Sequence, residues 1–327
     1  MDDDESKPAT SMPRATLRHV GHARKCRLID ASTADDELFV YQFALRMMGA
    51  EKAWSWIRQI RSSDILTAII DNGVDLNHPD LVGQLVPGRD FPCVTPECNG
   101  GSPEGIHGTA MAGIIAAARY NGGMIGTAWN TQLLPIRISS NDQTTSEMAA
   151  VDAVRYAVER GARVINFSYA SNEPTESLRR LLLELPGNFL FVVAAGNDGM
   201  QSSGPIYPAS YSIPRMMVVT SHDAHGNPDG AIGAGAQIDI AAPGDAVYPV
   251  PCSSSASGKC YEIDGASTSN AAAYVSGAAA LLWSAHPYWS AASIKRHILE
   301  TADPEPKLAR VMKVPRRLNL ARMMEPN

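Results

Sequence analysis

Three short segments, far apart in the chain, carry the side chains of one nucleophilic mechanism. Asp71 follows the apolar run Leu-Thr-Ala-Ile-Ile, His107 opens a run of small residues, and Ser269 opens another. A carboxylate that orients a histidine, together with a histidine that accepts a serine proton, makes that serine a nucleophile. The order Asp, His, Ser is one of several in which unrelated enzymes carry these residues. Because the order alone is weak support, the surrounding residues must decide.

Each residue taken singly also has a structural interpretation. Asp71-Asn72-Gly73 is a turn-forming sequence, and a lone histidine is more often structural than catalytic. His107, however, precedes Gly-Thr-Ala-Met-Ala-Gly, which predicts a closely packed helix that holds a first-turn histidine rigidly. An imidazole titrates near neutral pH, so a histidine fixed in this way favours general-base catalysis.

The elements that must position these residues alternate along the chain. Near-continuous apolar runs predict strands buried on both faces, at residues 66–70, 133–138, 163–167, 189–194, 216–220 and 238–241. Small-residue or amphipathic patterns predict helices at residues 107–119, 145–160, 176–185, 268–285 and 291–302. This alternation predicts an α/β fold with a mostly parallel central sheet and helices on both faces. In such sheets the site lies at the carboxyl ends of the strands, which is where Asp71 falls.

Composition excludes several classes of protein. Of the 327 residues, 45% are apolar and 19% are charged, which is typical of a globular chain that buries a sizeable core. The net charge is −6, and the absence of a Lys/Arg run argues against a nucleic-acid or membrane-surface partner. The longest apolar run, residues 189–195, is too short to span a membrane.

The three segments resemble the sequence boxes of the subtilisin family of serine peptidases. Residues 71–81 are similar to the family's Asp box, residues 107–113 to its His box and residues 268–282 to its Ser box. The resemblance extends over residues 35–302, and three boxes in order are far more specific than one motif. It implies a subtilisin-like three-layer sandwich and a serine endopeptidase that works through an acyl-enzyme, on peptide or protein substrates.

Two serines compete for the position of the nucleophile. Counting back from Val275-Ser276-Gly277 places it at Ser269, whereas counting from Gly265-Ala266 places it at Ser267. We favour Ser269, because Thr268 and the helix that follows then match the family pattern. This register departs from the family twice. Ser267 stands where the family has glycine, which adds a side chain beside the nucleophile, and Ala273 stands where it has proline, which removes a helix kink.

Two further segments resemble parts of the family's substrate site. Val-Val-Ala-Ala-Gly-Asn197 is similar to the oxyanion segment, which implies that the Asn197 amide donates to the developing oxyanion. The backbone N–H of Ser269 would be the second donor. Ser168-Tyr169-Ala170 is similar to the strand end that lines the substrate cleft, along which an extended peptide adds as a strand. The methyl group of Ala170, where the family has glycine, is expected to trim the pocket.

The resemblance also raises the question of structural calcium, which the chemistry itself does not require. Asp80 matches a family calcium ligand, and Asp35 or Asp36 is the counterpart considered for another. Arg119-Tyr120-Asn121 departs from the usual ligand loop, and Arg119 is a candidate to replace the ion.

Cysteine usage and the N-terminus point to different compartments, so localisation stays open. Met-Asp-Asp-Asp-Glu lacks the pattern of a signal peptide, which predicts a cytoplasmic start or a trimmed chain. The local pairs Cys93/Cys98 and Cys252/Cys260 would suit disulfides in a secreted protein, with free thiols as the alternative. Disulfides are favoured over a zinc site, because neither pair has CxxC spacing or a nearby histidine in the sequence.

The expected organisation is one peptidase domain with two flanks. Residues 1–34 are expected to form a flexible tail or short pro-segment, residues 35–305 the peptidase domain and residues 306–327 a C-terminal extension. A monomer is expected. Two rivals to a general peptidase remain: a maturation protease or peptide cyclase that handles one precursor, and a catalytically silent binding protein on the same fold.

Overall fold

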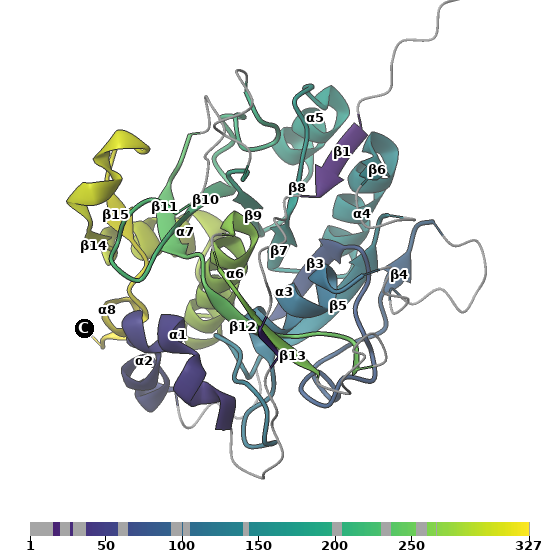
Figure 1. Cartoon of the computed structure of the whole chain (residues 1–327). Helices are drawn as coiled ribbons and strands as arrows, with labels where there is room; N and C mark the ends of the chain where they lie inside the picture. The colour runs from purple at the N-terminus through teal and green to yellow at the C-terminus, as the bar shows by residue number, and fades with distance from the viewer. Residues whose placement is uncertain are drawn as a thin grey trace, which may run out of the picture.

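A nine-stranded sheet forms the centre of the molecule (Figure 1). The computed structural model describes residues 16–19, 27–28, 37–57, 65–92, 100, 105–139, 144–197, 205–229, 237–252, 260–265 and 267–326. In spatial order the strands of the sheet are β14 (Asp303–Pro304), β15 (Arg316–Arg317), β11 (Ile240–Pro243), β10 (Met216–His222), β9 (Leu190–Ala194), β7 (Val164–Phe167), β3 (Leu66–Asp71), β5 (Gln132–Arg137) and β4 (Arg89–Asp90).

Neighbouring strands of this sheet run parallel, apart from the antiparallel pair β14 and β15. The prediction of an α/β fold with a mostly parallel sheet is therefore confirmed. All six strands expected from apolar runs are present, with ends that differ from the predicted ones by at most two residues.

Helices cover both faces of the sheet. One face carries α3 (His107–Ala116), α6 (Thr268–Ala285) and α7 (Ala291–Glu300), and the other carries α4 (Glu147–Glu159) and α5 (Glu176–Glu184). Successive strand residues alternate between two hydrophobic cores: Ile69 belongs to the first and Ile70 to the second. This arrangement explains why the strands read as unbroken apolar runs.

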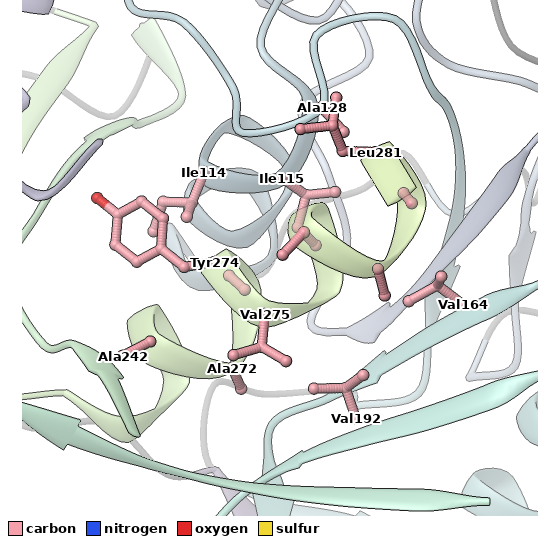
Figure 2. Packing of buried hydrophobic residues seen from close by; sticks show 14 of the residues in the cluster. Ile114, Ile115, Ala128, Val164, Val192, Ala242, Ala272, Tyr274, Val275 and Leu281 are labelled. Carbon is pink, nitrogen blue, oxygen red and sulfur yellow. The ribbon is translucent and has the colours of Figure 1, made fainter. Parts of the chain in front are cut away.

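Helix α6 is the buried axis of the first core. Figure 2 shows its residues packed between Ile114 and Ile115 of α3 on one side and Val192 of the sheet on the other. Its small residues permit this close packing, since a Cβ at Gly277 would meet Thr127 Cβ at 2.5 Å. The helix begins at Thr268 and ends at Ala285, the range expected from the sequence.

Two three-stranded sheets flank the central one, and the sequence did not predict them. In the first, β1 (Thr16–His19) lies between β6 (Thr144–Ser146) and β8 (Tyr169–Ala170). In the second, β13 (Tyr261–Asp264) lies between β12 (Ala246–Pro249) and β2 (Arg27–Leu28). Parts of the N-terminal segment therefore pair with the body of the protein.

The chain's C-terminal part packs on the same body. It includes η3 (Pro306–Arg310), β15 of the central sheet and α8 (Leu320–Met324), which packs against α2 (Ala50–Trp56). The remaining elements, η1 (Glu37–Tyr41) and α1 (Phe43–Met47), lead into α2. Among the described residues, no helix is both long and apolar enough to cross a membrane.

Candidate active site

Asp71 and His107 form a direct pair at the carboxyl edge of the sheet. His107 Nδ1 lies 2.9 Å from both carboxylate oxygens of Asp71. Asp71 is fully buried as the last residue of β3, and His107 is the first residue of α3. A buried carboxylate in this position fixes the Nδ1–H tautomer, because Nδ1 must donate to it. The other ring nitrogen, Nε2, is then an acceptor.

Asn72 and Gly108 hold this pair in place, and sequence analysis assigned neither of them a role. The Asn72 side-chain oxygen accepts the Gly108 N–H at 2.8 Å, and the Asn72 N–H donates to Asp71 at 2.8 Å. A Cβ at Gly108 would lie 2.1 Å from the carbonyl oxygen of Gly73. Only glycine permits this approach, so the glycine after His107 serves the docking of α3 onto the end of β3.

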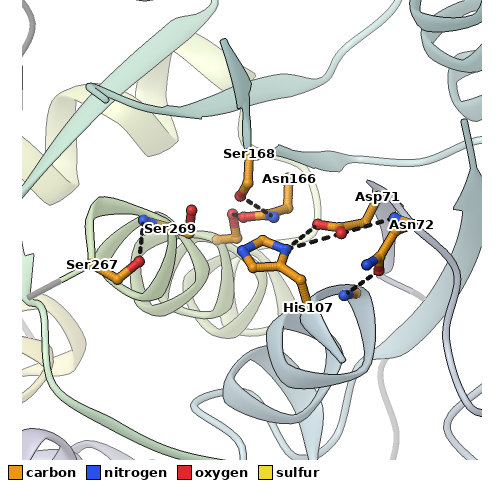
Figure 3. A network of polar contacts seen from close by, with 9 residues as sticks. Asp71, Asn72, His107, Asn166, Ser168, Ser267 and Ser269 are labelled. Atoms are coloured by element: carbon orange, nitrogen blue, oxygen red, sulfur yellow. Dashed lines mark hydrogen bonds and ion pairs between the residues drawn. The ribbon is translucent and has the colours of Figure 1, made fainter. Parts of the chain in front are cut away.

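Ser269 lies in the first turn of α6, facing the same edge. Figure 3 shows the His107 ring between Asp71 and this turn. Ser269 is fully buried, as is Thr268 before it, while Ser267 is 6% exposed. The starts of α3 and α6, about half the chain apart in sequence, thus lie at the same edge of the sheet as the Asp71–His107 pair.

Ser267 is the N-cap residue of α6, and its side chain accepts a hydrogen bond from the Ser269 backbone. The distance from the Ser269 nitrogen to Ser267 Oγ is 3.2 Å (Figure 3). Helices commonly begin on a serine whose oxygen satisfies a first-turn N–H. The other candidate for the nucleophile, Ser267, therefore has its hydroxyl oxygen bound to the backbone N–H of Ser269.

Asn197 links the end of β9 to the same turn of α6. Its side-chain oxygen accepts both the N–H and the hydroxyl of Thr268, each at 2.9 Å. Gly196, just before it, has φ +100°, a backbone conformation that favours glycine. Because its oxygen is committed to Thr268, the amide orientation of Asn197 is fixed, and sequence reasoning gave Thr268 no part in this.

A buried amide ties β7 to α6 below the site. The Asn166 side-chain oxygen accepts the Ser276 hydroxyl at 2.9 Å, and its amide nitrogen lies 3.4 Å from Ser168 Oγ. Both Asn166 and Ser168 are fully buried. Of the three residues expected to line the substrate cleft, Ser168 thus follows β7 directly, and Tyr169 and Ala170 form β8.

The strand β8 already has a neighbour. Arg18 of β1 pairs with Ala170, and His19 pairs with Tyr169, in antiparallel register. On its other edge β1 pairs with β6, so that Thr16 is opposite Ser146. Figure 1 shows β1, drawn in purple, between these two elements. The edge expected to receive an extended substrate is therefore occupied by a segment of the same chain.

The surroundings of Asp80 do not fit a calcium ion. One carboxylate oxygen accepts the Asn121 amide at 2.9 Å, and the other accepts the Met124 N–H at 3.0 Å. These groups direct hydrogens toward the carboxylate, whereas calcium requires a cage of oxygen lone pairs. The other residue considered, Asp35, lies outside the described residues.

Arg119 does not take the place of an ion next to Asp80 either. Its guanidinium lies over three aromatic rings, with distances of 5.4 Å to Trp54, 4.6 Å to Tyr120 and 5.8 Å to Trp129. Cation–π contacts of this kind anchor the loop after α3 to α2. The guanidinium therefore contacts aromatic rings and does not replace calcium beside Asp80, contrary to the expectation from the sequence.

Cys252 and Cys260 form a disulfide, while Cys93 and Cys98 lie outside the described residues. His78 lies beside this disulfide, and its Nε2 is 3.1 Å from the Cys260 carbonyl oxygen. His78 is 182 residues away from Cys260 in the sequence, so only the fold brings a histidine to this cysteine pair. Burial lowers the pKa of His78, and its Nδ1 accepts the Asp80 N–H at 3.1 Å, so the neutral ring fits the site.

A second buried histidine, His222, is linked through Gly244 to the start of α6. His222 ends β10, and its carbonyl oxygen accepts the Gly244 N–H, while the Gly244 carbonyl accepts the Ser267 N–H. Burial also lowers the pKa of His222.

A cavity of about 890 Å³ lies at the opposite edge of the sheet, by the starts of β10 and β11, away from the residues described above.

Comparison with known proteins agrees with the fold and with the motifs. A family model described as the subtilase family, Peptidase_S8, matches residues 62–318. Thermitase from Thermoactinomyces vulgaris is 34% identical over 269 residues, which cover 80% of this chain and 88% of thermitase. Subtilisin BL from Lederbergia lenta is 31% identical over 249 residues, which cover 75% of this chain and 86% of subtilisin BL.

A solved structure is similar across nearly the whole chain. Fervidolysin from Fervidobacterium pennivorans, a keratinolytic enzyme related to subtilisin, superposes with a TM-score of 0.74 at 23% identity. The match covers 96% of this chain and 52% of the fervidolysin chain. At this identity the similarity establishes the fold alone.

Proposed function

Because the chain belongs to the subtilase family of serine peptidases, we propose that Asp71, His107 and Ser269 form its catalytic triad. The chain is a serine-type endopeptidase by family. The observation that carries the assignment is the Nδ1 atom of His107, held 2.9 Å from both oxygens of the buried Asp71. This pair leaves Nε2 as the general base, facing the turn that carries Ser269 (Figure 3).

The proposed reaction has two halves. His107 Nε2 takes the hydroxyl proton as Ser269 Oγ attacks the peptide carbonyl, and the carbonyl oxygen becomes an oxyanion. The Asn197 amide and the Ser269 N–H stabilise this charge. Collapse breaks the C–N bond, and the leaving amine takes the proton from His107. Water then attacks the acyl-enzyme by the same route and releases the acid.

The substrate is proposed to bind as an extended strand on β8. Ser168 directly follows β7, and Tyr169 and Ala170 form β8, whose edge the peptide would pair with. The pairing of β1 with these residues supports this proposal, because it is an extended segment that uses the same edge.

We further propose that residues 1–34 act as a short pro-segment. Both β1 and β2 belong to this segment, and β1 uses the edge assigned to the substrate. The antiparallel register gives β1 a direction: it runs from Ala170 toward Ser168. A pro-segment in this position competes with substrate until it is removed or displaced.

The triad is tested by Asp71→Asn. An amide at position 71 presents its own N–H to His107 and favours the wrong tautomer, so we expect kcat to fall about 10⁴-fold, as in other serine peptidases. The measurement is steady-state hydrolysis of a peptide substrate, with circular dichroism to verify folding. A variant that keeps more than a tenth of the wild-type kcat would contradict the assignment.

A further inference from the structure

The N-cap of α6 uses the one backbone donor that the proposed reaction needs. The Ser269 N–H donates to Ser267 Oγ at 3.2 Å in the structure. In the proposed function, which this inference rests on, that N–H stabilises the oxyanion together with Asn197. One N–H cannot make two full-strength hydrogen bonds at once, so the Ser267 hydroxyl and the substrate oxyanion compete for it.

The position of the hydroxyl follows from its place in the chain. Ser267 has an extended backbone, with φ −118° and ψ 124°, as N-cap residues do. Its own N–H is bound to the Gly244 carbonyl, and the side chain is almost fully buried. Because the backbone is held on one side by Gly244 and on the other by the start of α6, the hydroxyl stays next to Ser269.

Asn197, the other proposed oxyanion donor, contacts the start of α6 through its side-chain oxygen. Asn197 uses its side-chain oxygen, not its amide nitrogen, to bind Thr268. The two donors therefore differ: Thr268 orients the Asn197 amide by donating to its oxygen, whereas the Ser267 cap engages the Ser269 N–H directly.

We propose that the Ser267 hydroxyl holds the place of the substrate oxyanion in the resting enzyme and lowers its rate. The reacting carbonyl oxygen must displace Ser267 Oγ from the Ser269 N–H before the oxyanion is fully stabilised. Ser267 is thus a positioning residue, which acts through Ser269. Its cost falls on the step in which charge develops, so it lowers kcat and leaves ground-state binding unchanged.

The variant Ser267→Ala tests this directly. Removal of Oγ frees the N–H, so we expect kcat to rise about fivefold, the factor that one net neutral hydrogen bond is worth. KM should stay at the wild-type value. A peptide aldehyde adds to the nucleophile and places an oxyanion at this site, so its Ki should fall by the same factor. Ser267→Thr, which keeps the hydroxyl, should retain wild-type values.

A matched control separates this effect from the loss of a helix cap. Ser290 caps α7, and its Oγ accepts the Ser293 N–H at 3.1 Å, next to Asn188 and Arg215 at the starts of β9 and β10, the edge of the sheet opposite the triad. Ser290→Ala should lower the melting temperature as Ser267→Ala does, with kcat and the aldehyde Ki unchanged. If Ser267→Ala folds poorly, Ser267→Gly offers the same freed N–H without a side chain.

Each possible result either supports the proposal or overturns it. A rise in kcat at constant KM, together with tighter aldehyde binding, supports the proposal. A fall in kcat would overturn it, and unchanged kcat and Ki would overturn it as well. If wild-type protein and variants alike fail to cleave peptides or react with a fluorophosphonate, the proposed function fails first, and this inference fails with it.

Discussion

At the scale of single residues, the site depends on groups that serve two tasks. Asn197 binds Thr268 through its oxygen, which fixes the amide nitrogen that the proposed mechanism uses. Asn72 likewise binds both Asp71 and Gly108, so it orients the carboxylate and docks α3 at once. The two tasks of such a residue can be separated experimentally only by variants that remove one task and keep the other.

Asn197 permits that separation. Asn197→Asp keeps an oxygen for Thr268 but replaces the amide donor with an acceptor, so we expect kcat to fall at least about 100-fold. In subtilisin, loss of the corresponding donor costs about 10²–10³ in kcat. Thr268→Val removes only the hydroxyl donor to the Asn197 oxygen and keeps the N–H donor, so it should change kcat less than about fivefold. Peptide hydrolysis measures both; equal losses in the two variants would assign Asn197 a structural role only.

At the scale of elements, the site is formed where three buried strands, β3, β7 and β9, end and two buried helices, α3 and α6, begin. β3 supplies Asp71, α3 supplies His107, and α6 supplies Ser269. The disulfide Cys252–Cys260 and His78 connect the β12–β13 region to the loop that carries Asp80. This connection depends on a neutral imidazole, which makes it sensitive to pH.

Acid should therefore weaken the fold through His78. Its folded-state pKa lies below the ordinary value of 6.5, so its contribution is present above pH 6.5 and is lost as pH falls below it. We expect His78→Gln to flatten the fall in unfolding free energy between pH 7 and pH 5.5, because glutamine does not titrate there. Denaturant unfolding across this range measures it. Unaltered slopes in His78→Gln would contradict the argument, and the exposed His225→Gln is the control.

At the scale of the whole molecule, the sequence predicted the central sheet, its covering helices and the Asp71–His107 pair at its edge. It could do so because buried parallel strands and a small-residue helix have patterns that depend on local burial alone. It missed β1, β2 and the pairing of the C-terminal segment, because two- to four-residue strands carry no periodicity. It also missed the role of Asn72, which depends on a contact with Gly108 across the fold.

The N-terminal segment gives a prediction at this scale. Leu17→Pro removes an N–H from β1, the middle strand of its sheet, and should release the substrate edge of β8. A tethered competitor acts at a millimolar effective concentration, so its release should raise initial kcat/KM about tenfold. Initial rates of peptide cleavage, with intact mass checked at the start, measure this.

The control for that experiment is Thr10→Pro, which lies ahead of β1 in the sequence. It should behave as the wild type does. Equal initial rates in Leu17→Pro and the wild type, with the N-terminus intact in both, would show that β1 does not compete with substrate.

The central claim is that Ser269 is a nucleophile activated by His107 and Asp71. The most direct measurement is reaction of the folded, full-length protein with a fluorophosphonate, followed by mass spectrometry of the modified peptide. We predict one adduct on Ser269, abolished by Ser269→Ala, strongly slowed by His107→Ala and retained in Ser267→Ala. An adduct on Ser267, or no adduct on a correctly folded protein whose N-terminal strand has been released by Leu17→Pro, would contradict the claim.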